Sequence, residues 1–443
     1  MQIKSTKDEA AWGWSKRGGN ASTGPDPYAG RGIYMCGYLD VPLDYTNKSD
    51  PRIARLAVTK FQVSGLARLG DRTDPAAGRK SGRTIVIEPG GPGASGTAYA
   101  WRAAQNVTER FSDGQYDVLG WDPRGVNTSL PTVACFPHEA SRDHWSLITT
   151  LHYAVSVSPR AQLEIVDAVN AAVMRSCWER LGDLGRFVGT GMVARDLEQI
   201  RIALGEEELT GYLVSYGTGI GQTYASMFPD SVGRVILDGT EYVRDHRLRG
   251  GFGYTALDNA TDAWHDGFLG ECVNAGPEHC TLAKPTDNKP VTLPSLATPP
   301  SPPPSSNPPS GPTTLHPSTT APHPIHPLNI ELGTMVICAD ASSDTTTPDD
   351  LDWWLSLWTN MTAQSWIAGN SRLFGVLPCR HYSTYWPDPV GVYSGDLNHT
   401  LKNPVLLIAE TYDPATPLRN GRRLLEEMGR NARLVAHHGG DEV

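Results

Sequence analysis

Gly211-Tyr-Leu-Val-Ser215-Tyr-Gly-Thr218 is the stretch that decides the predicted fold. Its apolar start is typical of a buried parallel strand, and Ser215 stands where that strand would turn abruptly into a helix. A nucleophile on such a tight turn projects its oxygen above the sheet, and small neighbours make room for it. We therefore take Ser215 as the candidate nucleophile. The backbone N–H of Tyr216 is a candidate donor to an oxyanion.

A plainer interpretation of the same residues is a serine N-cap on a glycine-rich helix start, which is common. The G-x-S-x-G pattern of serine hydrolases is only half satisfied, because Leu213 occupies the position of the first glycine. The side chain of Leu213 is expected to crowd the turn. The assignment of Ser215 therefore depends on what the rest of the chain supplies.

Other apolar runs of the same character surround this stretch, and each ends in a turn. Between two of them, residues 193–204 place apolar side chains at helical spacing, and Gly205 stands in the C′ position. Strand, helix and strand in this order predict an α/β fold with a mostly parallel central sheet flanked by helices. The predicted strands are 84–88, 116–121, 211–214 and 234–238.

A glycine-proline loop, Pro89-Gly-Gly-Pro-Gly93, directly follows the strand predicted at 84–88. Such a loop can point backbone N–H groups into a pocket, and Gly91 is the candidate for the second oxyanion donor. A phosphate-binding loop is disfavoured, because GxxxxGK[ST] needs a lysine that is absent here. A plain turn remains the alternative.

Asp413 is the candidate acid of a catalytic triad. It follows an apolar run at 405–408 and opens an Asp-Pro turn, which fits the chain order Ser…Asp…His of this hydrolase class. Aspartate before proline is also a frequent turn former. The histidine is expected roughly 25 to 30 residues later, on a loop. His437 and His438 lie on or just past the last predicted strand and are poor substitutes for it.

The composition excludes several functional classes. The net charge of −10 argues against nucleic acid or an anionic membrane as the main partner. The seven cysteines form no CxxC pair and have no histidine cluster beside them, so neither a metal nor another cofactor is expected. No window of about 18 apolar residues predicts a membrane span. The odd number of cysteines leaves one without a partner.

Glycosylation sequons favour passage through the secretory pathway, where disulfides form. The N-terminal residues nevertheless lack the apolar core of a signal peptide. Either the sequons are idle in an intracellular protein, or the sequence lacks its true start; we favour the second interpretation and a secreted protein. The sequons begin at Asn20, Asn47, Asn106, Asn127, Asn259, Asn360 and Asn398.

Taken together, these motifs resemble the tripeptidyl aminopeptidase-like branch of the prolyl aminopeptidase family of α/β-hydrolases. The similarity runs in the family's order from about residue 33 to the end. The segments that carry it are 36–45, 88–96, 117–126, 215–218, 338–340 and 404–417.

The resemblance implies a serine exopeptidase that removes short peptides or single residues from a free N-terminus. Ser215 and Asp413 carry over as nucleophile and acid, and Gly91 and Tyr216 as oxyanion donors. Asp122 and Arg124 match a structural turn and receive no chemical role. Carboxylates of a lid would bind the substrate's ammonium group, although no motif identifies them.

The resemblance also implies a domain plan. Residues 30–240 form the first part of the core, 241–399 a lid insertion and 400–443 an apparently truncated second part. The lid contains a proline-rich loop at 285–327, whose composition predicts disorder. Proximity and the resemblance together favour disulfides between Cys272 and Cys280 and between Cys338 and Cys379.

Two departures from the family matter. Leu213 replaces a glycine, and the catalytic histidine would fall near Glu442, where this sequence ends. We therefore expect little activity from the chain as written and a working peptidase from a longer form. An esterase or lipase of the same fold and a catalytically dead peptide-binding protein are the alternatives.

Overall fold

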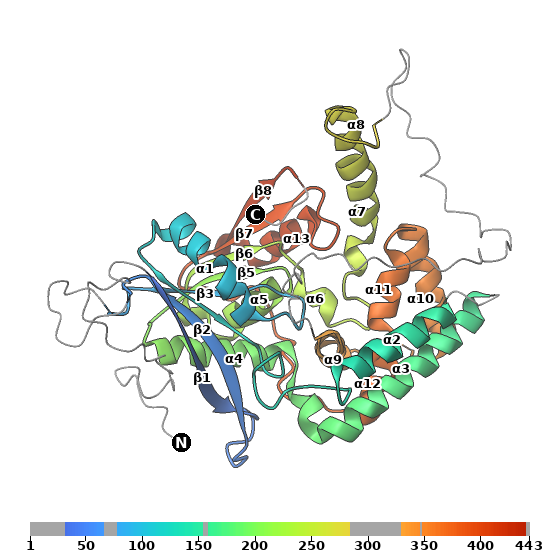
Figure 1. The fold of residues 1–443 in the computed structure, drawn as a ribbon, viewed down its shortest axis with the longest axis horizontal. Coiled ribbons are helices and arrows are strands. Elements are labelled where there is room, and N and C mark those ends of the chain that lie inside the picture. Colours follow the sequence, from blue (N-terminus) through green and yellow to red (C-terminus); the bar gives the residue numbers. More distant parts are fainter. Residues whose placement is uncertain (1–31, 66–77, 154–157, 284–328, 346–347, 440–443) are drawn as a thin grey trace, which may run out of the picture.

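The computed structural model describes residues 32–65, 78–153, 158–283, 329–345 and 348–439. Within them, strands form one eight-stranded sheet in the order β1-β2-β4-β3-β5-β6-β7-β8 (Figure 1). β1 and β2 pair antiparallel with each other, β2 pairs antiparallel with β4, and all other neighbours run parallel. The strands are β1 (Ile33–Pro42), β2 (Ile53–Gln62), β3 (Thr84–Glu88), β4 (Asp117–Trp121), β5 (Leu209–Val214), β6 (Val232–Asp238), β7 (Val405–Glu410) and β8 (Ala432–His437).

Alternation along the central strands builds two apolar layers. On β3, Ile85 and Ile87 join one cluster with helix α1 (Gly96–Ser112), while Val86 faces the opposite cluster. That second cluster is formed with α4 (Thr190–Leu204) and α5 (Tyr216–Met227). Successive side chains of a strand point to opposite faces, so a sheet covered on both sides needs continuous apolar runs. The predicted α/β-hydrolase fold is confirmed.

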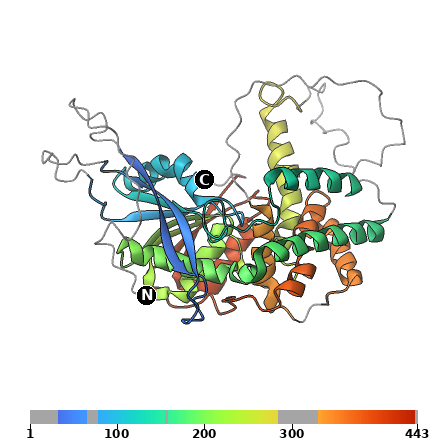
Figure 2. The same cartoon turned by 60° about the horizontal axis from the view of Figure 1, so that its bottom comes forward.

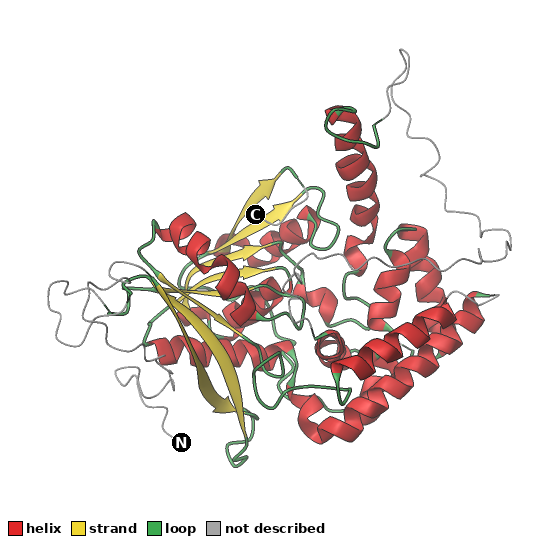
Figure 3. Ribbon diagram, in the orientation of Figure 1, coloured by secondary structure: helices red, strands yellow, loops and turns green. Residues whose placement is uncertain are grey.

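A helical layer lies beside the sheet, and Figures 1 and 3 show its helices gathered together. Most of them come from the chain between β6 and β7. Two helices that precede α4, α2 (Glu139–Tyr153) and α3 (Pro159–Leu181), join the same layer, since α3 packs against α10 and α12. The others are α6 (Val243–His246), α7 (Leu257–Asp262), α8 (Glu271–Ala275), α9 (Ile330–Asp340), α10 (Leu351–Gln364), α11 (Gly369–Val376) and α12 (Cys379–Tyr385).

An arm stands away from this layer in Figures 1 and 2. It consists of α7, a π-helical segment at Ala263–Gly270 and α8. Helix α13 (Leu418–Met428) packs against β7 and β8, and its Arg419 forms an ion pair with Asp258 of α7. The expected proline-rich loop at 285–327 and the expected histidine position at Glu442 lie outside the described residues.

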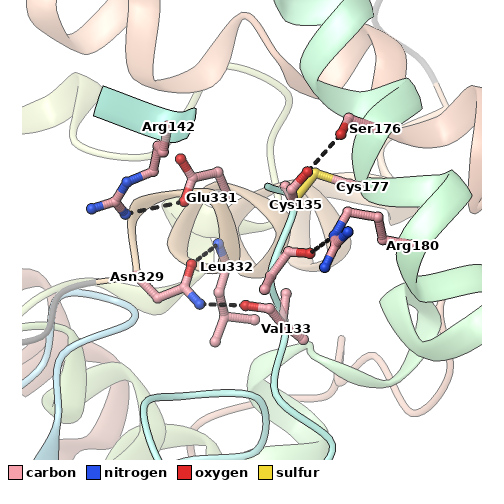
Figure 4. Close-up of a disulfide and its surroundings, with 10 residues drawn as sticks. Val133, Cys135, Arg142, Ser176, Cys177, Arg180, Asn329, Glu331 and Leu332 are labelled. Carbon is pink, nitrogen blue, oxygen red and sulfur yellow. Dashed lines mark hydrogen bonds and ion pairs between the residues drawn. A yellow bond between two sulfur atoms is a disulfide. The ribbon is translucent and has the colours of Figure 1, made fainter. Parts of the chain in front are cut away.

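The loop after β4 is fastened to the helical layer, as Figure 4 shows. Cys135 forms a disulfide with Cys177 of α3, and the hydroxyl of Ser176 donates to the carbonyl of Cys135 at 2.6 Å. Next to this bridge, the side-chain amide of Asn329 donates to the carbonyl of Val133 at 2.6 Å. The loop thereby ties α3 to the start of α9.

Three disulfides hold the described chain. The expected pairs Cys272–Cys280 and Cys338–Cys379 are both present, and Cys135–Cys177 is the bridge that the sequence left open. Cys36 is the free, exposed cysteine. No helix in the described ranges is long and apolar enough to cross a membrane.

Candidate active site

Ser215 lies on a sharp turn between β5 and α5. Its backbone adopts φ 54° and ψ −125°, a conformation that non-glycine residues rarely take. The turn is held on both sides: the N–H of Ser215 donates to the carbonyl of Asp238 at 2.9 Å, and Thr218 donates to the carbonyl of Ser215 through its N–H and its hydroxyl. Such a strained backbone persists only where its surroundings enforce it, and it is typical of functional sites.

Two glycines let other segments approach this turn closely. A Cβ at Gly90 would lie 2.7 Å from the carbonyl oxygen of Val214 and 2.8 Å from the backbone nitrogen of Tyr216. A Cβ at Gly217 would lie 2.4 Å from Oε2 of Glu88. The glycine loop after β3 is therefore packed directly on the turn that carries Ser215. Gly90 and Gly217 are needed for this close approach.

Leu213 does not crowd the turn. It is fully buried and points into the cluster with α4 and α5, whereas Tyr212 and Val214 point to the α1 side. The space for Leu213 comes from Gly221 on α5, where a Cβ would lie 2.9 Å from a methyl group of Leu213 and 2.4 Å from one of Leu237. Gly221 on α5 thus leaves the space that Leu213 needs in place of a glycine before the serine.

A cavity of about 60 Å³ lies over Ser215. Gly91 and Ser215 line one wall, so the structure brings the candidate nucleophile and the glycine loop together. Tyr216, the other predicted oxyanion residue, is buried, and its hydroxyl pairs with Oγ1 of Thr190 at 2.6 Å. That contact anchors the start of α5. Residues of the chain between β6 and β7 form most of the remaining wall, among them Glu241, Asp245, His246, Phe252 and Arg372.

Asp413 lies in the turn after β7. Its Oδ1 accepts the N–H groups of Ala415 and Thr416 at 2.7 and 2.8 Å, and its Oδ2 accepts the hydroxyl of Thr416. Its carbonyl accepts the side-chain amide of Asn259 at 2.6 Å. Among the described residues no histidine bonds to this carboxylate. The acid is therefore held by its own turn.

The two C-terminal histidines contact the end of β7 and the residues just before Asp413. Nδ1 of His437 is 3.9 Å from Oε1 of Glu410, and Nδ1 of His438 pairs with the hydroxyl of Thr411 at 3.1 Å. His438 also packs against the ring of Tyr412 with a centroid distance of 5.6 Å. Neither side chain lines the cavity over Ser215. In the described chain, Ser215 and Gly91 therefore share a cavity that neither of these two histidines lines.

The sequence missed a buried acidic residue and a histidine in the cavity. Oε2 of Glu241 lies 3.2 Å from Nε2 of His246, yet in the described chain it accepts no well-aligned hydrogen bond. Burial by itself would lower the pKa of His246, but the adjacent Glu241 carboxylate outweighs this and raises it. A signal for Glu241 existed, because it stands three residues past the end of a parallel strand, where such sheets bind ligands.

A second buried carboxyl group, that of Glu88, lies beneath the turn. Its Oε2 accepts the N–H of Gly90 at 2.8 Å. Burial raises the pKa of Glu88 well above its usual range, and the neighbouring carboxylates of Glu241 and Asp122 add to the effect. Glu88 is thus placed to hold the glycine loop.

Asp122 and Arg124 act as structural supports. Oδ1 of Asp122 accepts hydrogen bonds from Ser95 and Thr97 beside the glycine loop. Arg124 forms a buried, bidentate ion pair with Asp196 on α4, at 2.6 and 2.7 Å. In the residues that the structure describes, no group of three or more histidine, cysteine or acidic side chains could hold a metal ion.

Comparisons with known proteins agree with this geometry. The family described as alpha/beta hydrolase fold matches residues 83–279, and the family described as TAP-like protein matches residues 365–443. Serine protease Hip1 of Mycobacterium tuberculosis is 36% identical over 206 residues, which are 46% of this chain and 35% of that protein. The tripeptidyl aminopeptidase of Streptomyces lividans is 32% identical over 209 residues, again 46% of this chain and 35% of the relative.

The putative hydrolase YuaR of Escherichia coli is 34% identical over 221 residues, which are 48% of this chain and 37% of that protein. The match thus spans about a third of the length of each of these curated relatives. The strand order and the turn at Ser215 agree with the match to the alpha/beta hydrolase fold. The chain therefore has the α/β-hydrolase fold, and the two family matches together with these relatives support a TAP-like α/β-hydrolase.

Proposed function

We propose that this protein is a serine hydrolase that removes short peptides or single residues from free N-termini. The observation that carries the proposal is the strained backbone of Ser215 at the wall of a cavity shared with Gly91 and with the buried carboxylate of Glu241. A nucleophile, an oxyanion site and an ammonium-binding group would then meet in one place.

In this proposal, Oγ of Ser215 attacks the carbonyl carbon of the scissile peptide bond. The backbone N–H groups of Gly91 and Tyr216 stabilise the negative charge that develops on the carbonyl oxygen. Asp413 orients the histidine that takes the proton of the serine and passes it to the leaving amine. We do not assign that histidine to His437 or His438, because those two side chains are engaged elsewhere.

Glu241 is the residue that we propose for binding the substrate's ammonium group. It is buried, it lines the same cavity as Ser215, and its Oε2 has no hydrogen-bond partner in the described chain. A charged hydrogen bond in such a buried position would favour binding of peptides with a free N-terminal ammonium group over N-acylated peptides. The helices between β6 and β7, together with α2 and α3, would act as the lid that limits access.

We further propose that the protein works outside the cytosol. Its disulfides are of the kind that form and persist in oxidising compartments. Four of the sequons are exposed and open to glycosylation, whereas the side-chain amides of Asn127 and Asn259 are engaged in hydrogen bonds within the fold. The exposed sequons are at Asn47, Asn106, Asn360 and Asn398.

Labelling with a fluorophosphonate probe tests the nucleophile. The unmodified protein should be labelled, although slowly because little activity is expected from it, and Ser215→Ala should not be labelled. Ser146→Ala, which changes a serine away from the site, should be labelled to the same extent as the unmodified protein. Labelling that persists in Ser215→Ala, or that is absent from both proteins, would contradict the proposal.

Paired substrates test the exopeptidase assignment. A tripeptidyl naphthylamide with a free amine should be cleaved at least about tenfold better than its N-acetylated form, since a charged hydrogen bond contributes about 1.5–3 kcal/mol. The difference should vanish in Glu241→Gln. Equal cleavage of both forms, or faster turnover of a short acyl ester than of either peptide, would favour the esterase alternative.

A further inference from the structure

Arg372, on α11, lies where two cavities meet. It lines the cavity of about 60 Å³ over Ser215 and also a much larger one of about 850 Å³. The larger cavity lies between the arm formed by α7 and α8, helix α11 and the turn that contains Asp413. One guanidinium group therefore borders both the proposed site of bond cleavage and the space next to it.

The guanidinium group of Arg372 has no partner in the described chain. Two other arginines are paired with carboxylates: the buried Arg124 with Asp196 at 2.6 Å, and the partly buried Arg380 with Asp167 at 2.7 Å. For Arg372, no hydrogen bond or ion pair of the side chain joins it to any described residue. A mostly buried cation without a partner costs free energy, which is regained when a ligand supplies the missing acceptor.

The position of this side chain is fixed by its packing. A Cβ at Gly253 would lie 3.1 Å from Cδ, Nε and Cζ of Arg372, so the side chain rests directly on the bare backbone of this glycine. Gly253 has φ 69°, a conformation that favours glycine. The guanidinium group is thus confined at the junction of the cavities.

The guanidinium group of Arg372 stays charged and is not paired with the nearby carboxylates, so it can bind an anionic ligand. Burial lowers its pKa, and the carboxylates of Glu241 and Asp413 act in the opposite direction. Neither carboxylate is close enough to form an ion pair with it. An arginine remains charged at neutral pH even when its pKa is lowered, because its ordinary value is so high.

We propose that Arg372 binds a carboxylate group of the peptide substrate. The proposal rests on the proposed function and extends it to the substrate class: short peptides with a free ammonium group at one end and a carboxylate within reach of the larger cavity. With the ammonium group at Glu241 and the scissile carbonyl at Ser215, the rest of the peptide passes Arg372. The planar guanidinium group can donate two parallel hydrogen bonds to a carboxylate there.

The larger cavity suits the hydrocarbon parts of such a peptide. Trp264 and Phe268 of the arm stack with a centroid distance of 5.2 Å and line it together with Ile367. Besides Arg372, the titratable side chains that line this cavity are those of Glu271, His438 and Tyr412. A carboxylate would therefore be drawn to Arg372 and away from Glu271.

Calorimetric binding to the Ser215→Ala protein tests the proposal without turnover. Trialanine with a free carboxylate should bind at least about tenfold more tightly than trialanine amide, the range expected for a charged, bidentate hydrogen bond. In Ser215→Ala/Arg372→Gln the two ligands should bind equally. Equal affinity of acid and amide for the Ser215→Ala protein would overturn the proposal.

A second pair of ligands separates the two sources of a carboxylate. If Arg372 binds an acidic side chain, an amidated tripeptide with a central aspartate should bind more tightly than the same peptide with asparagine. If it binds the C-terminus, these two amides should bind alike while the free acid of trialanine keeps its advantage. Either pattern supports binding of a carboxylate at Arg372. If the same preference persisted in Arg372→Gln, the proposed role of Arg372 would be refuted.

Control variants distinguish a lost contact from a lost fold. Arg175→Gln changes an exposed arginine of α3 and should leave the preference for the free acid intact. Arg372→Lys keeps the charge but not the planar fork, so part of the preference should remain. Gly253→Ala should weaken it by displacing the guanidinium group. A preference unchanged in Arg372→Lys and Gly253→Ala, as well as in Arg372→Gln, counts against the proposal.

Failure of this inference can be told apart from failure of the proposed function. N-acetylation of trialanine should weaken binding through Glu241, independently of Arg372. Binding that depends on the ammonium group but not on the carboxylate would overturn only the role of Arg372. If no peptide binds at millimolar concentration, both the role of Arg372 and peptide specificity are wrong, while fluorophosphonate labelling would still identify a serine hydrolase.

Discussion

A single glycine, Gly90, is needed for Ser215 to adopt its strained turn conformation. Gly90 has φ 95°, and a Cβ there would meet the backbone on both sides of Ser215. We predict that Gly90→Ala destabilises the protein by about 1–3 kcal/mol and abolishes fluorophosphonate labelling, because the turn must shift. Urea unfolding and labelling measure both effects. Gly82→Ala is the control, since its Cβ would meet nothing within 4 Å, and a loss of similar size there would contradict the argument.

A single buried acid should give the stability of the protein a pH dependence. The raised pKa of Glu88 means that the native state keeps a proton that the unfolded chain releases near its ordinary pKa of 4.5. This contribution is complete below that value and is lost as pH rises toward the native pKa, by about 1.4 kcal/mol per pH unit within the window. From pH 5 to pH 8, the urea midpoint of unfolding should decrease more in the unmodified protein than in Glu88→Gln. An equal decrease in both proteins would show that Glu88 is ionised in the folded state.

At the level of elements, α4 is capped from a distant helix. Gly189 offers α4 no side-chain cap, and Asp340 at the end of α9 accepts the N–H of Thr190 at 2.9 Å instead. The hydroxyl of Thr190 bonds to both Asp340 and Tyr216, so this cap joins the insertion, the core and the start of α5. Burial raises the pKa of Asp340, and its hydrogen bonds with Thr190 oppose the shift.

We predict that Asp340→Ala costs about 2–4 kcal/mol, because it leaves buried donors of Thr190 unsatisfied and uncouples two elements. Asp350→Ala is the matched comparison. It removes an exposed N-cap of α10, which accepts from Trp353 at 2.8 Å, and should cost only about 1 kcal/mol. Chemical denaturation of both variants measures the difference. Equal losses would show that the cap at Asp340 has no role beyond its helix.

For the whole molecule, the disulfides should contribute unequally. Cys135–Cys177 closes a separation of 42 residues and fastens the loop in Figure 4, whereas Cys272–Cys280 closes only 8. In the chain-entropy account, the first contributes about 4 kcal/mol and the second about 2.5 kcal/mol. Replacing each pair with serines and comparing unfolding free energies tests this order. A larger loss for Cys272–Cys280 would contradict it.

The sequence alone predicted the sheet and the turn at Ser215 because these are local. Apolar runs, a helix ended by Gly205 and glycines after Ser215 follow from backbone preferences within a few residues, and the structure confirms them with boundaries shifted by up to three residues. The roles of Ser215 and Asp413 remain predictions, although both residues lie in turns at the carboxyl ends of parallel strands.

Tertiary structure decided what surrounds Ser215. Glu241, His246 and Arg372 line its cavity, and all three come from the long insertion between β6 and β7. The sequence of this insertion shows no periodic apolar pattern that would predict which side chains face inward. The pairing of Cys135 with Cys177 and the space that Gly221 leaves for Leu213 depend on segments that meet only after the chain folds. Local preferences set the scaffold of this α/β-hydrolase fold, but long-range packing of the insertion sets the charges around the candidate nucleophile.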